Sequence, residues 1–536
     1  MLLIPLAVLG VLVFDLAHQS HAADDHLVDL GYSKYNGVAR NGINTWWGIR
    51  YAAPPLRDLR FKAPQDPSHN DAIQQADTHG AVCHPSPSTS LNTGFNEDCL
   101  FLDVYAPAAD NKLHPVFIWL QGGGLNGLAD TRSDGTSLIN AADKDMVVVT
   151  FNYRVGLYGF LASREVQANG DSNAGLLDQR KLLHWVQKYI HLFGGDPSRV
   201  TLGGASAGAG SVSLHLTAYG GRDDKLFHAV TAESPSYGVQ YTIAEAQYQY
   251  DALVQRVDCD KAPDTLKCLR ALPVKILAEN NPNLPTPGGT GGTPVFMWSN
   301  VVDGTFTQGF SYDLYAQGKF VKVPAIFGST TNEGTGAAPR SLENAGQMNS
   351  FLKNNFPKLT QAHLTKIDSL YPDPPNDLIF PGAGEYWRPA SNAYGNMRYN
   401  CPSLFMSGSF PRIGGSNATW NYHWDVLRPG DATSGDGVGH VAEQSSVWGT
   451  PGPTEKPIAP TIQAYWASFI RTHNPNTLKL AGSPEWVEYM DGDPTRGAMQ
   501  RMHFPNDVKK IGMETVAPGL REKCSFWLSV GSTIGQ

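Results

Sequence analysis

The chain has 536 residues, of which 41% are apolar and 17% are charged, and its formal net charge at pH 7 is −8. This composition predicts a compact protein with a large buried core and argues against an intrinsically disordered chain. Because the net charge is negative and no run of Lys and Arg stands out, we expect no nucleic-acid partner.

The first 22 residues differ in character from the rest of the chain. Residues 2–16 are almost wholly apolar, and Ser20 and Ala22 supply the small residues typical of a signal-peptide cleavage site. The pattern predicts a secretory signal peptide at residues 1–22 and a secreted mature chain at residues 23–536. An uncleaved anchor is the alternative, but the apolar run is short for a membrane span and no comparable run follows it.

Six cysteines in an exported chain predict three disulfides. They are Cys83, Cys99, Cys259, Cys268, Cys401 and Cys524. Their number alone leaves the pairing open. The tripeptide Asn417-Ala418-Thr419 is an acceptor for N-glycosylation, so we expect a glycan on Asn417.

Apolar runs and amphipathic segments alternate along the mature chain. Strands are predicted at residues 114–120, 146–150, 199–202 and 323–327, and helices at residues 178–193, 207–218 and 462–470. This alternation is typical of an α/β protein with a largely parallel sheet that helices cover on both faces. No repeat or clear linker divides the mature chain, so we expect one domain over residues 23–536.

A G-x-S-x-G motif runs from Gly204 to Gly208, with Ser206 at its centre. It follows one predicted strand directly and precedes a predicted helix. Strand, sharp turn and helix are the setting of a nucleophile elbow, in which the turn exposes the serine hydroxyl and the glycines allow close backbone approach. A loop rich in small residues is the alternative. The flanking elements favour Ser206 as the nucleophile of an acyl-transfer enzyme.

A second glycine run, residues 122–124, follows the predicted strand at residues 114–120. Attack of a serine on a carbonyl carbon requires hydrogen-bond donors for the developing oxyanion, and backbone N–H groups after a buried strand can supply them. An ordinary turn is the alternative. We predict that this run contributes to an oxyanion hole, with the N–H of Ala207 as a third donor.

The serine also requires a histidine base and a carboxylate, in the chain order Ser, Asp or Glu, His. Glu333 follows the predicted strand at residues 323–327, although an isolated glutamate is more often a solvated surface group. The histidines after it are His363, His423, His440, His473 and His503. His423 belongs to an alternating strand and His473 ends a helix, which indicates structural roles. His440 lies in a glycine-rich loop and is the favoured base.

Two long blocks carry a family resemblance. Residues 96–105 read NEDCLFLDVY, and residues 193–211 read FGGDPSRVTLGGASAGAGS. The first resembles the EDCLxLxVY signature, and the second the serine active-site signature, of the type-B carboxylesterase/lipase family, the cholinesterase-like α/β-hydrolases. Further similar blocks lie at residues 48–61, 151–154, 175–180, 301–304 and 524–527. The matches extend over nearly the whole mature chain, which looks nearest to the secreted fungal carboxylesterases.

The resemblance implies the α/β-hydrolase fold, with a large, mostly parallel central sheet, helices on both faces, and loop and helix insertions around the active-site gorge. It implies a catalytic triad of Ser206, Glu333 and His440. The implied oxyanion donors are the N–H groups of Gly123, Gly124 and Ala207. The implied disulfides are Cys83–Cys99, Cys259–Cys268 and Cys401–Cys524. The implied structural ion pairs are Arg60–Glu97 and Arg154–Asp178.

Two positions depart from the family pattern. Gln121 stands where the oxyanion block usually begins with His or Tyr, and Ala205 stands where the elbow usually has Glu. The Glu that Ala205 replaces normally adds a carboxylate beside the triad, so we expect a changed network there. Glu443, three residues after His440, matches a second family carboxylate and is retained. No Trp lies between the first two cysteines, which disfavours a quaternary ammonium substrate.

Together these features predict a serine hydrolase that cleaves small carboxylic esters through an acyl-enzyme, with no metal ion or organic cofactor. The segment between the first two cysteines has only Leu91 and Phe95 as apolar residues, so it would make a poor lid. We therefore expect an open gorge and soluble short- to medium-chain or aromatic substrates. One alternative is a lipase or sterol esterase whose lid is another loop, such as residues 285–294. A non-catalytic adhesion protein is a further alternative, which the intact triad disfavours.

Overall fold

The computed structural model describes residues 26–87, 94–108, 112–127, 133–372, 380–414, 418–490 and 499–536. The predicted signal peptide at residues 1–22, the glycosylation acceptor Asn417 and Leu91 lie outside these residues.

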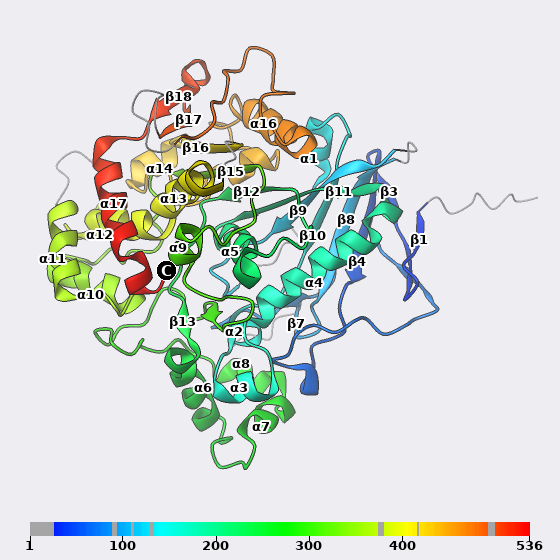
Figure 1. The fold of residues 1–536 in the computed structure, drawn as a ribbon, viewed down its shortest axis with the longest axis horizontal. Helices are drawn as coiled ribbons and strands as arrows, with labels where there is room; N and C mark the ends of the chain where they lie inside the picture. Colours follow the sequence, from blue (N-terminus) through cyan, green and yellow to red (C-terminus); the bar gives the residue numbers. More distant parts are fainter. Residues whose placement is uncertain are drawn as a thin grey trace, which may run out of the picture.

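One eleven-stranded sheet runs through the described part of the chain, in the order β18-β17-β16-β15-β12-β11-β9-β10-β8-β4-β3 (Figure 1). Its strands are β3 (Val38–Arg40), β4 (Ile43–Arg50), β8 (Phe101–Pro107), β9 (His114–Leu120), β10 (Val147–Phe151), β11 (Gly195–Ala205), β12 (Ala229–Glu233), β15 (Ala325–Thr330), β16 (Thr419–Asp425), β17 (Gln500–Pro505) and β18 (Gly512–Thr515). Neighbours from β10 to β17 are parallel. The outer pairs are antiparallel. The predicted parallel sheet is therefore the central part of a larger mixed sheet.

Short strands and helices surround this sheet. The short strands are β1 (Leu27–Asp29), β2 (Lys34–Asn36), β5 (Ile73–Gln75), β6 (Val82–Cys83), β7 (Phe95–Asn96), β13 (Tyr241–Thr242) and β14 (Val301–Val302). The helices are α1 (Thr136–Ala141), α2 (Gly156–Phe160), α3 (Arg164–Asn169), α4 (Ala174–Tyr189), α5 (Ala207–Gly221), α6 (Ile243–Arg256), α7 (Thr265–Ala271), α8 (Val274–Glu279), α9 (Ser311–Ala316), α10 (Ala345–Asn355), α11 (Gln361–Leu370), α12 (Trp387–Gly395), α13 (Cys401–Ser409), α14 (Pro429–Ser434), α15 (Gln444–Val447), α16 (Ala459–Thr472) and α17 (Pro518–Ile534).

The alternation of side chains along β9 explains why helices cover both faces of the sheet. Val116, Ile118 and Leu120 belong to the apolar core that includes residues of α4 and α5. Phe117 and Trp119 point to the opposite face, into a second core that includes residues of α1 and α16. Each such side chain, once buried, stabilises the fold by roughly 1.5–3 kcal/mol. A strand that is apolar on both faces must be covered on both, and here helices around the central sheet supply the two layers (Figure 1).

The predicted elements agree with the structure in type and differ at their ends. The strand predicted at residues 114–120 is β9, whereas the one predicted at residues 199–202 is the longer β11. The helix predicted at residues 178–193 begins earlier, after Asn173, and ends in a 3₁₀ turn. The amide of Asn173 exchanges two hydrogen bonds with the backbone of Val301, at 2.8 and 2.9 Å. This long-range contact fixes the start of α4 and leaves no local mark in the sequence.

The six cysteines form the disulfides Cys83–Cys99, Cys259–Cys268 and Cys401–Cys524. These are the pairs that the family resemblance implies. The third joins α13 to α17 across 123 positions of sequence, so it attaches the C-terminal helix to the core. No free cysteine occurs among the described residues.

The two ion pairs implied by the resemblance are also present. Arg60 Nη2 lies 2.6 Å from Glu97 Oε2, and Arg154 Nη2 lies 2.6 Å from Asp178 Oδ1. All four side chains are at most 8% exposed. Removing one partner would leave a buried charge, which typically costs about 3–5 kcal/mol.

No helix in the described part of the chain combines the length and the apolar character that a membrane span requires.

Candidate active site

Ser206 lies at the turn where β11 passes directly into α5. Its φ of 57° and ψ of −122° lie outside the regions that non-glycine residues ordinarily adopt. Hydrogen bonds on both sides hold this conformation: the Ser206 N–H donates to the Glu233 carbonyl at 2.8 Å, and the Ser206 carbonyl accepts from the Ser236 N–H at 3.1 Å. The turn is therefore strained and fixed by its surroundings, as a nucleophile elbow requires.

Close packing explains the two glycines of the motif. A Cβ atom on Gly204 would lie 2.6 Å from the Gly208 carbonyl carbon, and one on Gly208 would lie 2.0 Å from the Leu120 carbonyl oxygen. Any side chain at these positions would overlap backbone. Glycine therefore lets α5 begin directly against the ends of β9 and β11.

His440 joins Ser206 to Glu333. Its Nε2 lies 2.8 Å from Ser206 Oγ, and its Nδ1 is hydrogen-bonded to Glu333 Oε2. The other oxygen of Glu333 accepts hydrogen bonds from Ser234 Oγ at 2.7 Å and from the Thr330 N–H at 2.8 Å. The Glu333 side chain is fully buried, whereas that of His440 is 24% exposed. The arrangement gives His440 a fixed carboxylate on one side and the Ser206 hydroxyl on the other.

The loop that carries His440 is attached to the turn that carries Glu333. The Asn332 N–H donates to the Val438 carbonyl at 2.8 Å, and the Asn332 side-chain oxygen accepts a hydrogen bond from the Val438 N–H at 2.9 Å. The Tyr399 ring packs against the imidazole, with the ring centroids 4.2 Å apart. Two long loops are thus held in register, which sets the orientation of the imidazole.

The glycine loop after β9 packs directly on the nucleophile. A Cβ on Gly122 would lie 3.0 Å from Ser206 Cβ, while Gly123 and Gly124 have positive φ values of 91° and 65°. Tyr153 Oη donates to the carbonyl of Gln121 at 3.0 Å and anchors the start of the loop. The N-terminus of α5 lies at Ser206 as well, and the dipole of a helix favours negative charge at that end. The surroundings of Ser206 therefore suit a developing oxyanion.

Two further carboxyl groups are buried close to the triad. Glu233 ends β12 and is the register partner of Ala205 in β11, and Glu443 accepts a hydrogen bond from Tyr422 Oη at 2.5 Å. Neither glutamate is exposed. Burial raises the pKa of Glu233 well above its ordinary value, and the neighbouring Glu443 raises it further. Burial and the nearby Glu333 raise the pKa of Glu443 to about 7. This pair favours one retained proton, because two adjacent buried anions repel each other.

Glu233, Ser234 and Tyr422 belong to the site but are not predicted from the sequence. A weak signal was available for Glu233, which is a carboxylate at the end of a short apolar segment shortly after the elbow. Its proximity to Ala205 depends on pairing between β11 and β12, which the sequence does not display. Glu233 supplies a carboxyl group beside the elbow position where the family pattern usually has Glu.

The other candidate histidines lie outside this hydrogen-bonded chain. His363 belongs to the N-terminal capping box of α11, and His473 is the C-terminal cap of α16. His423 lies in β16 and His503 in β17, where they are register partners. The structure thus brings together Ser206, Glu333 and His440 and leaves the remaining histidines elsewhere.

The sequence of this chain is similar to those of known proteins. The family model described as the carboxylesterase family matches residues 25–527. A Gibberella zeae protein named Secreted lipase 4 is 29% identical over 537 residues, which cover 93% of this chain and 92% of that protein. Lipase 2 of Geotrichum candidum is 32% identical over 388 residues, covering 64% of this chain and 69% of its own length.

A solved structure described as the crystal structure of Aspergillus niger EstA has the same fold. It is 36% identical, the comparison covers 95% of this chain and 99% of that one, and the TM-score is 0.90. The large mixed sheet with helices on both faces is accordingly the α/β-hydrolase fold. The extent of the family match and this structural agreement lead to one conclusion: the chain belongs to the carboxylesterase family.

Proposed function

We propose that this protein hydrolyses carboxylic esters, with Ser206 as nucleophile, His440 as general base and Glu333 as the carboxylate that orients it. One observation carries the proposal. It is the unbroken chain of hydrogen bonds from Ser206 Oγ through both ring nitrogens of His440 to Glu333. A serine hydroxyl is a poor nucleophile by itself, and this chain is the means by which serine hydrolases activate it.

The steps follow from the arrangement. His440 Nε2 removes the proton from Ser206 Oγ as the oxygen attacks the ester carbonyl carbon. Glu333 accepts a hydrogen bond from Nδ1–H, keeps the ring in the required tautomer and stabilises the imidazolium. The protonated ring then gives its proton to the departing alcohol, and an acyl-enzyme remains. Water, activated by the same ring, attacks this intermediate and releases the acid.

The tetrahedral intermediates carry a negative oxygen that needs donors. We assign this task to the N–H groups of Gly123, Gly124 and Ala207. The packing of the glycine loop on Ser206 and the position of Ala207 as the first residue of α5 support the assignment. Donors fixed by the fold need no reorganisation when the charge develops, which is why they lower the barrier.

For the substrate we propose soluble short- to medium-chain or aromatic esters that reach an open gorge. The polar composition of the segment between Cys83 and Cys99 supports this proposal, although residues 88–93 of that segment lie outside the described part of the chain. The alternative is hydrolysis of lipid esters, which the names of the Gibberella zeae and Geotrichum candidum relatives favour.

Tributyrin distinguishes these two substrate classes. An esterase with an open gorge follows ordinary saturation as the tributyrin concentration passes its solubility limit. A lipase with a lid shows a sharp rise in rate once droplets form. We expect the first result, and the second would assign the protein to the lipases.

We further propose that residues 1–22 are a signal peptide and that residues 23–536 form one secreted catalytic domain. The family match over residues 25–527 supports the domain, and the name of the Gibberella zeae relative supports secretion. N-terminal sequencing of protein secreted by a host that recognises signal peptides should begin at Ala23 if the cleavage site is right.

The Ser206→Ala variant tests the central assignment. We expect it to lower the turnover of nitrophenyl butyrate by about 10⁴-fold or more and to leave the fold intact. Ser198→Ala is the matched control, because Ser198 is exposed and its hydroxyl bonds to the Asp196 carboxylate and not to a triad residue. A wild-type protein that hydrolyses no ester would favour the adhesion alternative, and a Ser206→Ala protein with a tenth of the wild-type rate would refute the nucleophile.

A further inference from the structure

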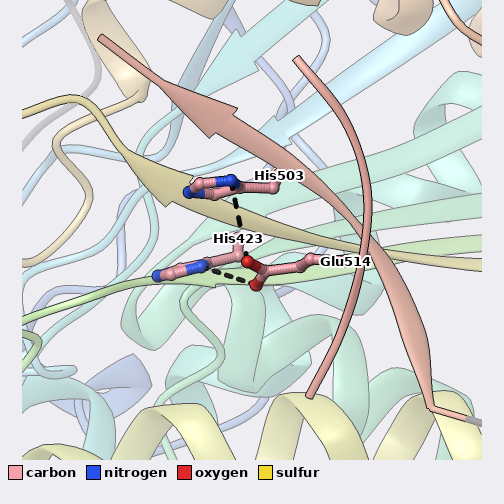
Figure 2. A group of neighbouring side chains, drawn as sticks. All are labelled: His423, His503 and Glu514. Atoms are coloured by element: carbon pink, nitrogen blue, oxygen red, sulfur yellow. Dashed lines mark hydrogen bonds and ion pairs between the residues drawn. The ribbon is translucent and has the colours of Figure 1, made fainter. Parts of the chain in front are cut away.

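Three ligand-capable side chains meet on neighbouring strands at the edge of the large sheet, outside the triad. His423 comes from β16, His503 from β17 and Glu514 from β18 (Figure 2). One ligand atom from each lies within 4.8 Å of the others. The two imidazoles stack with their centroids 5.2 Å apart, because His423 and His503 are register partners in parallel strands. Their side chains are 13% and 24% exposed, so a small ion could reach them.

Hydrogen bonds on the outer side of this edge cluster define where the ring protons lie. Thr331 Oγ1 donates its only proton to the Asp425 carboxylate, so it accepts a hydrogen bond from His423 Nε2, which lies 2.9 Å away. His503 Nε2 faces the other oxygen of Asp425 at 3.3 Å. A carboxylate can only accept hydrogen bonds, so both rings carry a hydrogen on Nε2.

The inner nitrogens of both rings face a second carboxylate. His423 Nδ1 lies 2.8 Å from Glu514 Oε1, and His503 Nδ1 lies 3.6 Å from Glu514 Oε2. In a neutral ring with its hydrogen on Nε2, Nδ1 carries a lone pair. Two lone pairs then point toward an anion, which is unfavourable unless a cation lies between them. A single proton could serve only one of the two nitrogens, whereas a metal ion could serve both and the carboxylate together.

We propose that His423, His503 and Glu514 form a binding site for one divalent transition-metal ion, with Zn²⁺ as the preferred occupant. Two imidazoles and one carboxylate are an established zinc ligand set, and the fourth position can hold water at this partly exposed edge. Asp425 plays the part of the outer carboxylate that orients metal-bound histidines, directly for His503 and through Thr331 for His423.

The interatomic distances suit this ion. A zinc ion about 2.0–2.1 Å from each ligand separates neighbouring ligand atoms by roughly 3.3 Å in a tetrahedral site. The separation of 3.6 Å between His503 Nδ1 and Glu514 Oε2 is close to that value, and ligand atoms of all three residues lie within 4.8 Å of one another. Small side-chain movements are enough to reach it.

Arg501 shares the carboxylate with the proposed ion. Its Nε donates to Glu514 Oε1 at 2.7 Å, and its side chain is 6% exposed. Oε2, the oxygen nearer to His503, remains for the metal. The guanidinium weakens the attraction of Glu514 for a cation, so we expect a weaker site than one with an unshared carboxylate. A metal ion bound at this site would connect β16, β17 and the edge strand β18.

The test uses the full-length secreted protein without a histidine tag, after removal of metals with a chelator. Titration with Zn²⁺ in a calorimeter at neutral pH is expected to give saturable binding of one ion per chain, and zinc should raise Tm. Protein loaded with Co²⁺ should show the visible absorption of a low-symmetry, four-coordinate nitrogen and oxygen site. Ester hydrolysis is measured in parallel, so that failure of the proposed function and failure of this site are distinguishable.

Matched variants identify the ligands. His503→Ala should abolish saturable zinc binding, and Asp425→Asn should weaken it by about 10- to 100-fold, as loss of an outer carboxylate does. His69→Ala is the control, since His69 is exposed and pairs with Asp71. Wild-type protein that binds no zinc, or that shows no cobalt spectrum, overturns the proposal, as does unchanged binding in folded His503→Ala. If the wild-type protein binds no zinc but its Tm falls more steeply with rising pH than that of His503→Ala, the cation is a proton and not a metal.

Discussion

The triad and the edge cluster both place histidine beside glutamate, but the fold assembles them in different ways. The triad residues come from an elbow and two loops that follow the ends of central strands. The edge cluster comes from the bodies of three strands, where pairing places His423 opposite His503. Thr331, two residues before Glu333, connects the two regions through its hydrogen bond to His423.

This difference has a chemical consequence. A nucleophile must meet an incoming ester, and positions beyond the ends of strands leave room for one. Side chains within a sheet are held by the pairing of their own strands and suit a group that binds an ion and does not move. The same pair of residue types can therefore serve catalysis at one place and ion binding at another.

Removal of the triad histidine gives the largest expected effect, and removal of an edge-cluster histidine provides the comparison. His440→Ala should lower kcat/KM for nitrophenyl butyrate by about 10⁴-fold, because Ser206 loses its base. His423→Ala should keep most of the activity, since its ring contacts Thr331 and Glu514 and not the nucleophile. Comparable losses in both folded variants would contradict the separation of the two regions.

A smaller effect is expected at the glycine loop. Gly124 has a φ of 65°, and a Cβ there would lie 2.2 Å from the Phe296 ring. Gly124→Ala should displace its N–H and lower kcat by about 10²–10³-fold, the usual cost of losing one oxyanion donor. Gly519→Ala is the matched control, because no atom lies within 4 Å of the added methyl group. Steady-state rates showing full activity for Gly124→Ala would remove this loop from the oxyanion hole.

The buried carboxyl pair gives a pH-dependent effect on stability. Burial and the charge of Glu333 raise the pKa of Glu443 from 4.5 to about 7 in the folded protein. Between these values the folded state holds more protons than the unfolded state, so stability falls as pH rises through this range and levels off above it. The contribution is on the order of 3 kcal/mol. In Glu443→Gln this decline should be smaller but still present, because burial continues to raise the pKa of Glu233, while the hydrogen bond from Tyr422 can persist.

Urea unfolding of wild-type and Glu443→Gln protein at several pH values between 4.5 and 8 measures this difference. Parallel curves for the two proteins would show that Glu443 ionises freely in the folded state. Glu514 of the edge cluster provides the contrast with Glu443. It pairs with the Arg501 cation and is partly exposed, whereas Glu443 is buried beside other carboxyl groups.

The sequence predicts the triad better than its surroundings for a physical reason. Ser206 requires a strained turn with nearby glycines, and His440 lies among glycines. Both residues can therefore be recognised from their neighbours in the sequence. Glu333 is marked more weakly, and the family resemblance was needed to select it. Glu233 and His503 acquire their partners through strand pairing, which joins residues far apart in the chain.

The ends of helices and strands also depend on contacts between residues far apart in the chain. Residues 114–120 form a strand that is buried on both faces, and their own apolar character predicts it. The start of α4 depends on the contact between Asn173 and Val301. The antiparallel edges of the sheet depend on pairing between strands, such as that of β17 with β18. A short window of sequence does not encode either feature.

Covalent trapping tests the central claim most directly. The wild-type protein is incubated with a nitrophenyl organophosphate until activity is lost, and intact mass and peptide mapping locate the adduct. We predict one phosphoryl group per chain, on the peptide that contains Ser206, with one equivalent of nitrophenol released. Loss of activity with the adduct on another residue, or complete inactivation with Ser206 unmodified, would contradict the account.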